Sequence, residues 1–175
     1  MHAGKYARVE RERRFLLEAP PAPSSVTVTR VITDRYLPGT RLRLRHSERR
    51  DGGAAELKLT QKIPAGRPGA VQGLITTTYL SRAEYDLLAS LPAAVLTKTR
   101  LSVPPLGVDV FDGPLTGLVL AEAEFADDEE ALAFEPPAEC AAEVTDDIRF
   151  TGGSLATASR EALAGWLAEY GIRLG

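Results

Sequence analysis

The sequence predicts an α+β fold in which eight short antiparallel strands close into a barrel, with a few helices packed outside it. Clusters rich in Gly, Pro, Asp and Ser interrupt the chain at short intervals, and most segments between them have the length and alternation of strands. The chain has 175 residues, of which 44% are hydrophobic and 26% charged. This size and composition are typical of one folded domain, expected over residues 1–175.

The expected strands follow these turn signals in order along the chain. Pro-Gly and Asp-Gly steps mark several of the turns, for example at residues 38–39, 51–52 and 112–113. Regular short strands joined by hairpin-length loops are typical of a meander that closes into a sandwich or barrel. The strands are expected at 7–16, 26–36, 41–48, 54–63, 71–80, 94–103, 107–112 and 117–125.

Three segments are expected to form helices. Ser81 and Glu84 have the spacing of a capping box, which predicts a helix that begins after Ser81 and ends before Pro92. Residues 127–134 begin with acidic side chains, which the helix dipole favours in a first turn. The third helix is expected over 154–170, and its apolar stripe is expected to pack against the outside of the sheet.

Composition excludes several classes of site and partner. Cys140 is the only cysteine, so an internal disulfide and a cysteine-cluster zinc site are excluded. With two histidines, the sequence gives little basis for a histidine metal site or a Ser-His-Asp triad. A net charge of -3 does not suggest a nucleic-acid binder. The charged opening and the short apolar runs predict a cytoplasmic protein without a membrane partner.

Charged residues recur at alternate positions in five of the expected strands, which places them on one face of each strand. The sequence Arg-Leu-Arg-Leu-Arg at 41–45 is the clearest case, with three guanidinium groups on one face. The whole set comprises four carboxylates, Glu10, Glu12, Glu122 and Glu124, and eight cations, Arg14, Arg41, Arg43, Arg45, Lys58, Lys62, Lys98 and Arg100.

Two interpretations of this pattern compete. A solvent-exposed sheet face is the simplest explanation for any single strand. Exposed faces usually mix charges of both signs, however, whereas each of these strands is nearly of one sign. Like charges in a row repel unless an anion lies over them. The five strands together therefore favour a tunnel or deep cleft that holds a polyphosphate, with Glu-x-Glu pairs as oxygen ligands for Mg²⁺ or Mn²⁺.

The ordered series of motifs resembles the CYTH domain superfamily, the triphosphate tunnel metalloenzymes. The string VERERRFLL at 9–17 is similar to the family's ExExK opening strand. The resemblance covers nearly the whole chain, and its strength lies in the order of the motifs. It continues through Tyr36, the Arg-x-Arg-x-Arg strand, LTQK at 59–62, KTR at 98–100, LAEAEF at 120–125, FEPP at 134–137 and EVTDD at 143–147.

The resemblance implies an eight-stranded tunnel barrel that acts on a triphosphate with a divalent metal. It implies that Glu10, Glu12 and the second acidic strand bind metal and that the basic strands bind phosphate. Tyr36 and Lys98 stand where short bacterial triphosphatases of the family have residues implicated in catalysis.

Some positions depart from the family pattern. Arg14 stands where the opening signature has Lys, which keeps the charge and changes the geometry. Ile75 and Thr77 occupy positions where active members usually carry acids, so a single firmly held metal ion is expected. Ile148 and Phe150 replace what is often Lys and Tyr.

The leading hypothesis is a metal-dependent hydrolase of a small triphosphate, with inorganic tripolyphosphate as first candidate. The alternative is a non-catalytic module that binds polyphosphate or a nucleotide, because the acids at positions 75 and 77 are missing. A thiamine triphosphatase is a less favoured alternative, and an adenylate cyclase ranks last because no adenine pocket can be read from the sequence. Asp109 either reaches the tunnel or pairs with a surface cation, and both possibilities stay open.

Overall fold

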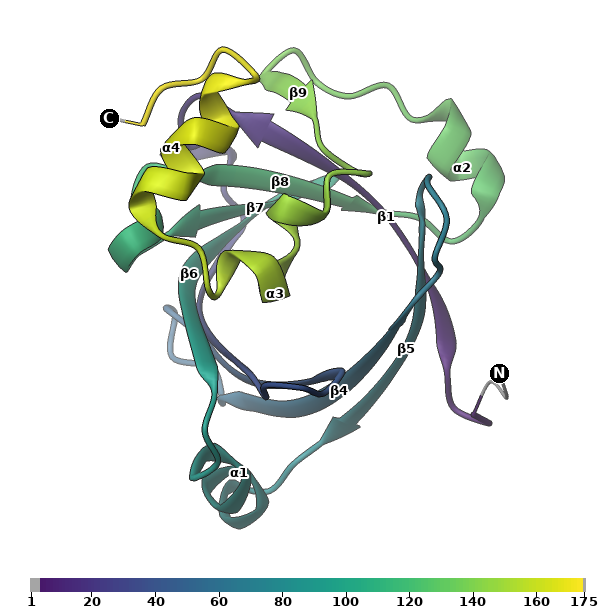
Figure 1. Cartoon of the computed structure of the whole chain (residues 1–175), viewed down its shortest axis with the longest axis vertical. Helices are drawn as coiled ribbons and strands as arrows, with labels where there is room; N and C mark the ends of the chain where they lie inside the picture. Colours follow the sequence, from purple (N-terminus) through teal and green to yellow (C-terminus); the bar gives the residue numbers. More distant parts are fainter. Residues whose placement is uncertain (1–3, 175) are drawn as a thin grey trace.

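An eight-stranded antiparallel barrel forms the body of the molecule, and Figure 1 shows its strands arranged in a ring. This finding, from a computed structural model that describes residues 4–174, confirms the predicted α+β barrel with helices outside it. The strands of the barrel are β1 (Arg8–Leu17), β2 (Val28–Tyr36), β3 (Leu42–Arg49), β4 (Glu56–Pro64), β5 (Val71–Tyr79), β6 (Ala94–Val103), β7 (Leu106–Phe111) and β8 (Val119–Glu124).

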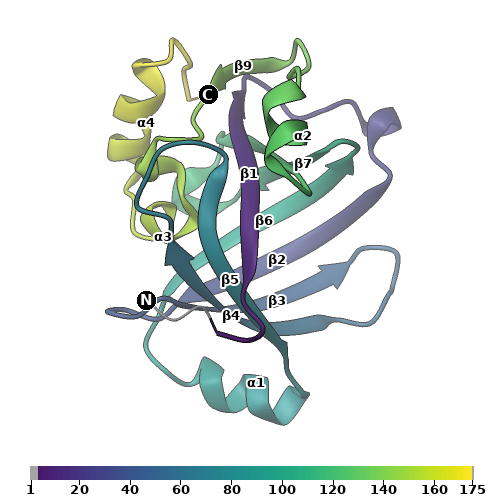
Figure 2. The ribbon, with the colours of Figure 1, turned by 90° about the vertical axis from the view of Figure 1, so that its right-hand side faces the viewer.

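The barrel closes because β1 is long enough to pair with two neighbours in turn. Its first residues pair with β5, which lies beside it in Figure 2, and residues 12–17 pair with β8. The register shifts by a bulge between Glu10 and Arg11. Gly73, opposite Glu10, has a φ of 144°, and a Cβ there would lie 2.0 Å from the carbonyl oxygen of Ile63. Only glycine fits this crowded closing point, which brings Glu10 beside the tunnel.

A ninth strand is present that the sequence pattern did not predict. β9 (Cys140–Glu143) pairs with the end of β1 outside the eight-stranded wall. Residues 125–140 cover the outer face of β1, β7 and β8, where Phe15, Val108 and Ala121 form an apolar cluster that Phe134 packs against. One apolar layer of this wall therefore lies outside the barrel, on the face opposite inner polar residues such as Glu12 and Glu122.

The first two predicted helices are present with the predicted caps. α1 (Arg82–Ala89) begins at the capping box, in which Ser81 Oγ accepts from Glu84 N and the Glu84 carboxylate accepts from Ser81 N. Its Tyr85 packs with Leu44 on the outside of the barrel. α2 (Asp128–Ala133) begins after Asp127, which accepts from the backbone of the first turn. Within residues 4–174, no helix is long and apolar enough to cross a membrane.

The predicted helix over 154–170 is in fact two helices. α3 (Gly152–Leu155) ends early, and α4 (Arg160–Ala168) begins anew because Ser159 Oγ accepts from Ala162 N at 3.1 Å. Leu163 and Leu167 of α4 join one cluster with Leu16, Leu120 and other residues of the barrel's inner face. The stripe therefore covers one end of the barrel, and the expectation that it packs on the outside of the sheet is corrected.

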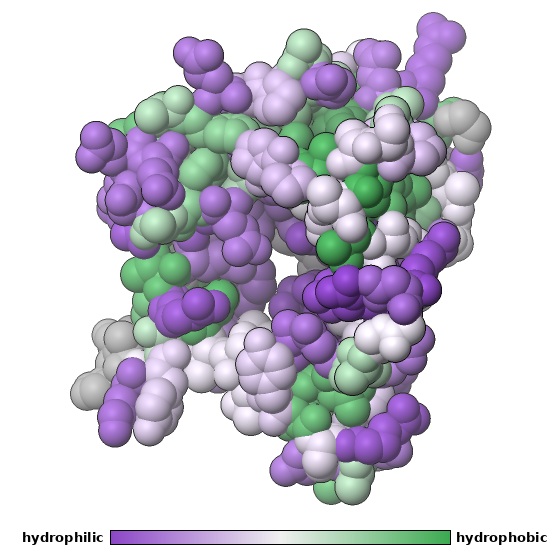
Figure 3. Space-filling model, turned by 180° about the vertical axis from the view of Figure 1, so that it is seen from behind, coloured by the Kyte–Doolittle hydropathy of each residue, from purple (hydrophilic) through white to green (hydrophobic). Residues whose placement is uncertain are grey.

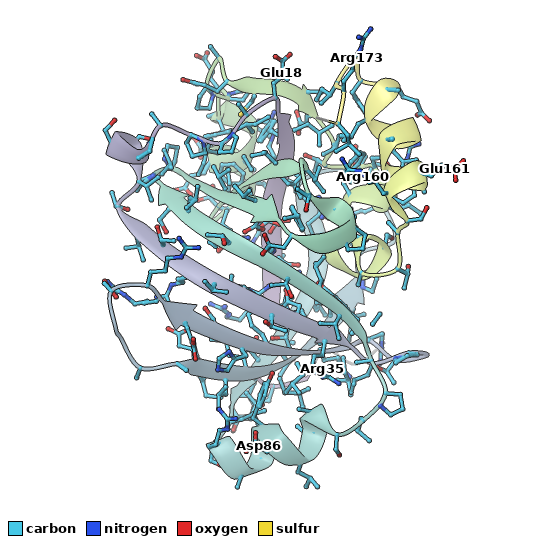
Figure 4. The ribbon with its side chains drawn as sticks, turned by 90° about the vertical axis from the view of Figure 1, so that its left-hand side faces the viewer. Glu18, Arg35, Asp86, Arg160, Glu161 and Arg173 are labelled. Atoms are coloured by element: carbon cyan, nitrogen blue, oxygen red, sulfur yellow. The ribbon has the colours of Figure 1, made fainter. Side chains whose placement is uncertain are left out.

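Charged side chains also cover the outside of the molecule. Figure 4 shows Glu18, Arg173 and Glu161 pointing away from the barrel, while Asp86 lies on α1 at the other end. Arg11 and Arg13 alternate with the inner residues of β1, and they bind Asp128 and Glu143 on the outside at 2.6 and 2.7 Å. These ion pairs attach the outer segments to the wall, so they are structural.

Candidate active site

The alternating charges of the sequence meet inside the barrel. Strand register places Arg45 opposite Lys58, and Glu12 opposite Glu124, on its inner face. A cavity of about 570 Å³ lies along this face, and Arg45, Lys58, Arg100 and Glu122 are among the residues that line it. The space-filling view shows a hollow at the centre with hydrophilic side chains around it (Figure 3).

Asp34 of β2 anchors the arginines of β3. Its side chain is 0% exposed, and Arg45 donates from Nε and Nη2 to its two oxygens, each at 2.7 Å. Arg43 Nε lies 3.7 Å from the same carboxylate and has no hydrogen-bond partner among residues 4–174. Burial alone would raise the pKa of Asp34, but the bonds and charge of Arg45 hold it below its usual value. Arg41 precedes β3 and is exposed.

Asp109 of β7 is the equivalent anchor for β6. Lys98 Nζ and Arg100 Nε each lie 2.5 Å from its carboxylate oxygens, and Arg100 Nη2 lies 2.7 Å away. Asp109 is 0% exposed, so of the two positions left open by the sequence it takes the one facing the tunnel. Arg100 also donates to Glu122, which links the basic residues of β6 to the acidic residues of β8.

The acidic residues lie on two adjacent strands, β1 and β8. Glu12 is buried beside Arg14, whose Nη1 is 3.5 Å from it. Burial, followed by the charges of Glu122 and Glu10, raises the pKa of Glu12 to about 8. Burial would also raise the pKa of Glu122, but the charges of Arg100 and Lys98 hold it well below the usual range. Glu10 binds Lys62 Nζ at 2.8 and 3.1 Å, and Glu124 is exposed.

The donor chemistry of this acidic set fits a hard divalent cation. Carboxylate oxygens are the ligands that Mg²⁺ and Mn²⁺ prefer. The pKa of Glu12 is raised by burial and by the neighbouring carboxylates, and a bound cation would lower it again. In residues 4–174, no three His, Cys, Asp or Glu side chains already stand together in metal-ligating positions. Lys62 and Arg100 hold Glu10 and Glu122, so a metal ion would have to replace these partners.

Arg14 and Lys58 are also held in place by neighbours. Arg14 N donates to Thr145 Oγ1 at 3.1 Å, and its Nη2 donates to the Thr145 carbonyl oxygen at 2.7 Å. Lys58 Nζ lies 2.6 Å from Glu56, which also contacts Arg30 at 3.5 Å. Asp34, Glu56, Arg30 and Thr145 were not predicted as site residues from the sequence. Alternation with Tyr36 and with Lys58 could have indicated Asp34 and Glu56.

Tyr36 and Lys98 lie on the inner face but at different depths. Lys98 is opposite Ile32, four residues before Tyr36 on β2. A Cβ at Gly152 would lie 1.9 Å from Tyr36 Oη, so glycine is needed where α3 meets the tyrosine. Burial, with a smaller contribution from Asp34, raises the pKa of Tyr36 to about 12. The hydroxyl is therefore protonated at neutral pH and is a hydrogen-bond donor there, not a base.

The departures in β5 do face the tunnel. Ile75 lies opposite Lys62, and Thr77 lies opposite Thr60, with 3.0 Å between the two threonine hydroxyls. Ile148 is 75% exposed, whereas Phe150 is fully buried in the cluster beneath α4. Position 75 therefore presents an alkyl group, and position 77 a hydroxyl, to the inner face.

Comparison with known proteins relates this barrel to two solved structures of the protein NE1496. One, the inorganic triphosphatase NE1496, is 25% identical with a TM-score of 0.55, over 86% of this chain and 96% of that chain. The other, described as the hypothetical protein NE1496, is 27% identical with the same TM-score, over 86% and 99%. The chain is CYTH-like in its barrel fold and in the order of its sequence motifs.

A further solved structure is less similar. The PH1819 protein from Pyrococcus horikoshii OT3 is 17% identical with a TM-score of 0.49, over 94% of this chain and 92% of that chain. No family model matches the sequence, and a search of curated proteins gives no match either.

Proposed function

We propose that this CYTH barrel hydrolyses a small linear triphosphate, inorganic tripolyphosphate first, with the help of Mg²⁺ or Mn²⁺. The observation that carries the proposal is the concentration of cations from β3, β4 and β6 around one cavity of about 570 Å³. A linear polyanion matches such a lining because each phosphate meets further Arg or Lys donors. The similarity to the inorganic triphosphatase NE1496 supports the same class of reaction.

The residues of the chain divide into two groups in this proposal. Arg43, Arg45, Lys98 and Arg100 would bind the phosphate oxygens and stabilise charge that develops on the transferred group. Glu10, Glu12, Glu122 and Glu124 would hold the metal. A divalent metal bound there would supply charge neutralisation of the phosphates and activation of water.

Tyr36 and Lys98 have the chemistry of donors in this scheme. Tyr36 keeps its proton at neutral pH, and the ammonium of Lys98 is fixed against Asp109 at 2.5 Å. Both would therefore donate to phosphate oxygens or to a leaving group, and neither is assigned the role of general base.

A binding module is the second candidate, and the inner face of β5 favours it. Ile75 and Thr77 put no carboxylate there, so binding keeps its full set of cations while metal-assisted hydrolysis has fewer ligands. A substrate with a ring is less favoured, because no aromatic side chain is among the described residues that line the cavity. An adenine or thiamine ring would find no stacking partner there.

Phosphate release from tripolyphosphate, pyrophosphate, ATP and thiamine triphosphate tests the proposal, with Mg²⁺, Mn²⁺ or chelator and with chromatography for cyclic AMP. We expect metal-dependent release that is fastest from tripolyphosphate. Tight binding of tripolyphosphate without release under any metal would leave the binding module. Cyclic AMP from ATP would replace the hydrolase with a cyclase.

A further inference from the structure

We infer that Asp34 and Asp109 are positioning residues, which fix the tunnel's arginines in the orientation that triphosphate hydrolysis requires. The inference rests on the proposed function. Each acid belongs to a strand beside its arginine: Asp34 of β2 is paired directly with Arg45 of β3, and Asp109 of β7 directly with Arg100 of β6. Both carboxylates are 0% exposed, so neither serves as a solvated surface charge.

The geometry of the two ion pairs is the same. Arg45 and Arg100 each use Nε and Nη2 to bind both oxygens of their acid, at 2.5–2.7 Å. Both arginines line the tunnel cavity. Across residues 4–174, Nη1 of neither arginine donates a hydrogen bond to another group of the protein. Each carboxylate thus fixes one edge of a planar guanidinium and leaves Nη1 for a ligand, while Nη2 of Arg100 also donates to Glu122.

Each acid also acts on a second cation of the site. Lys98 Nζ lies 2.5 Å from Asp109, and Arg43 Nε lies 3.7 Å from Asp34. Four cations of the inner face therefore depend on two carboxylates, which offset their mutual repulsion while the tunnel is empty. Without these carboxylates the cations would keep their charge but would adopt several orientations. We therefore expect that losing either acid lowers turnover much more than affinity.

The test uses Asp34→Asn and Asp109→Asn, with Asp147→Asn as matched control. Asp147 binds Arg149 through the same two nitrogens, at 2.9 and 2.7 Å, but next to α4 rather than in the tunnel. Calorimetry with tripolyphosphate gives the affinity, phosphate release gives kcat, and thermal melting reports the fold. We expect kcat to fall at least about tenfold in both tunnel variants, with an affinity within about threefold of wild type, and neither to change in the control.

Arg45→Lys covers the case in which an asparagine variant does not fold. Lysine keeps the positive charge at this position but cannot bind both oxygens of Asp34 as the planar guanidinium does. The variant should therefore show the same fall in kcat with little loss of affinity. An unchanged kcat in these variants would overturn the inference. A loss of affinity as large as the loss of kcat would also overturn it, because that result indicates a general structural role.

Failure of the proposed function gives a different result. If the wild-type protein binds tripolyphosphate but releases no phosphate, the ratio of its affinities for tripolyphosphate and pyrophosphate becomes the readout. Oriented arginines should give a ratio that falls at least about fivefold in Asp34→Asn and Asp109→Asn. An unchanged ratio, or no binding by the wild-type protein, would overturn the positioning role as well.

Discussion

Glu12 of β1 and Glu124 of β8 lie directly opposite each other across an antiparallel strand pair, on the inner face of the barrel. Like charges in directly opposed positions destabilise a sheet unless a cation lies between them or one carboxyl is protonated. The carboxyl of Glu12 is the one that is protonated near neutral pH, since burial and the neighbouring acids raise its pKa to about 8. We therefore regard Glu12 as the residue at which metal, proton and stability are linked.

Glu12→Gln should abolish metal-dependent turnover and leave the fold intact. The amide keeps the shape of the side chain but removes one carboxylate of four, so repulsion falls while metal affinity is lost. Phosphate release and Mn²⁺ calorimetry measure the two effects, and thermal melting is expected to show equal or higher stability. Release at the wild-type rate would mean that the proposed metal site is wrong.

Stability without metal should fall as the pH rises from about 4.5 to about 8. The pKa of Glu12 is raised from 4.5 in the folded state, so in this window the folded protein binds more protons than the unfolded chain, and deprotonation favours unfolding. Melting temperatures across this range, compared between the wild type and Glu12→Gln, isolate the contribution of this residue. Equal pH dependence of the melting temperature in both proteins would contradict a contribution from Glu12. Saturating Mn²⁺ should remove much of the wild-type decline.

Arg43→Ala should weaken triphosphate binding by about 1.5–3 kcal/mol, the range for hydrogen bonds to charged groups. Arg43 lies in the middle of the Arg-x-Arg-x-Arg series, and its Nε makes no hydrogen bond within residues 4–174, so the ion pair with Asp34 at 3.7 Å leaves its hydrogen-bonding capacity to a ligand. Calorimetry at two salt concentrations measures the loss. Arg82→Ala on exposed α1 is the control. An affinity equal to that of the control would mean that these arginines do not bind the ligand.

Ile75→Glu with Thr77→Glu should raise metal affinity, and turnover with it. Both side chains face the tunnel, opposite Lys62 and Thr60, so the new carboxylates would add oxygen ligands to the acidic set. Thr76→Glu with Thr78→Glu places the same charges on the opposite face of β5 and serves as control. Mn²⁺ calorimetry counts the ions bound by each double variant. Equal metal binding in the two would exclude a role of this β5 face in holding metal.

Much of the fold and of the tunnel face follows from local sequence. Turn signals gave the eight strands, and alternation placed residues such as Arg43, Arg45, Lys98 and Glu122 on one face, because side-chain direction in a strand has a period of two. β9 was missed because four residues of mixed polarity give no periodic signal. The break between α3 and α4 was missed because an apolar stripe continues across it.

The buried anchors could not be predicted in the same way. Asp34 is a single acid within its strand, and its importance comes from Arg45, which is adjacent only after β2 and β3 pair. The same holds for Asp109 and Arg100. The raised pKa of Glu12 depends on burial and on Glu122 and Glu10, which are a matter of tertiary structure. Sequence alternation thus predicts which side chains share a face, and pairing decides which charges neutralise one another.

The most direct measurement is phosphate release from tripolyphosphate by metal-free protein, before and after addition of Mn²⁺, with Glu12→Gln measured in parallel. We predict no release without metal, release by the wild-type protein once Mn²⁺ is added, and none by the variant under either condition. Tripolyphosphate that binds the wild-type protein yet stays intact with Mn²⁺, or is cleaved equally by the variant, would contradict the account of this barrel as a metal-dependent triphosphatase.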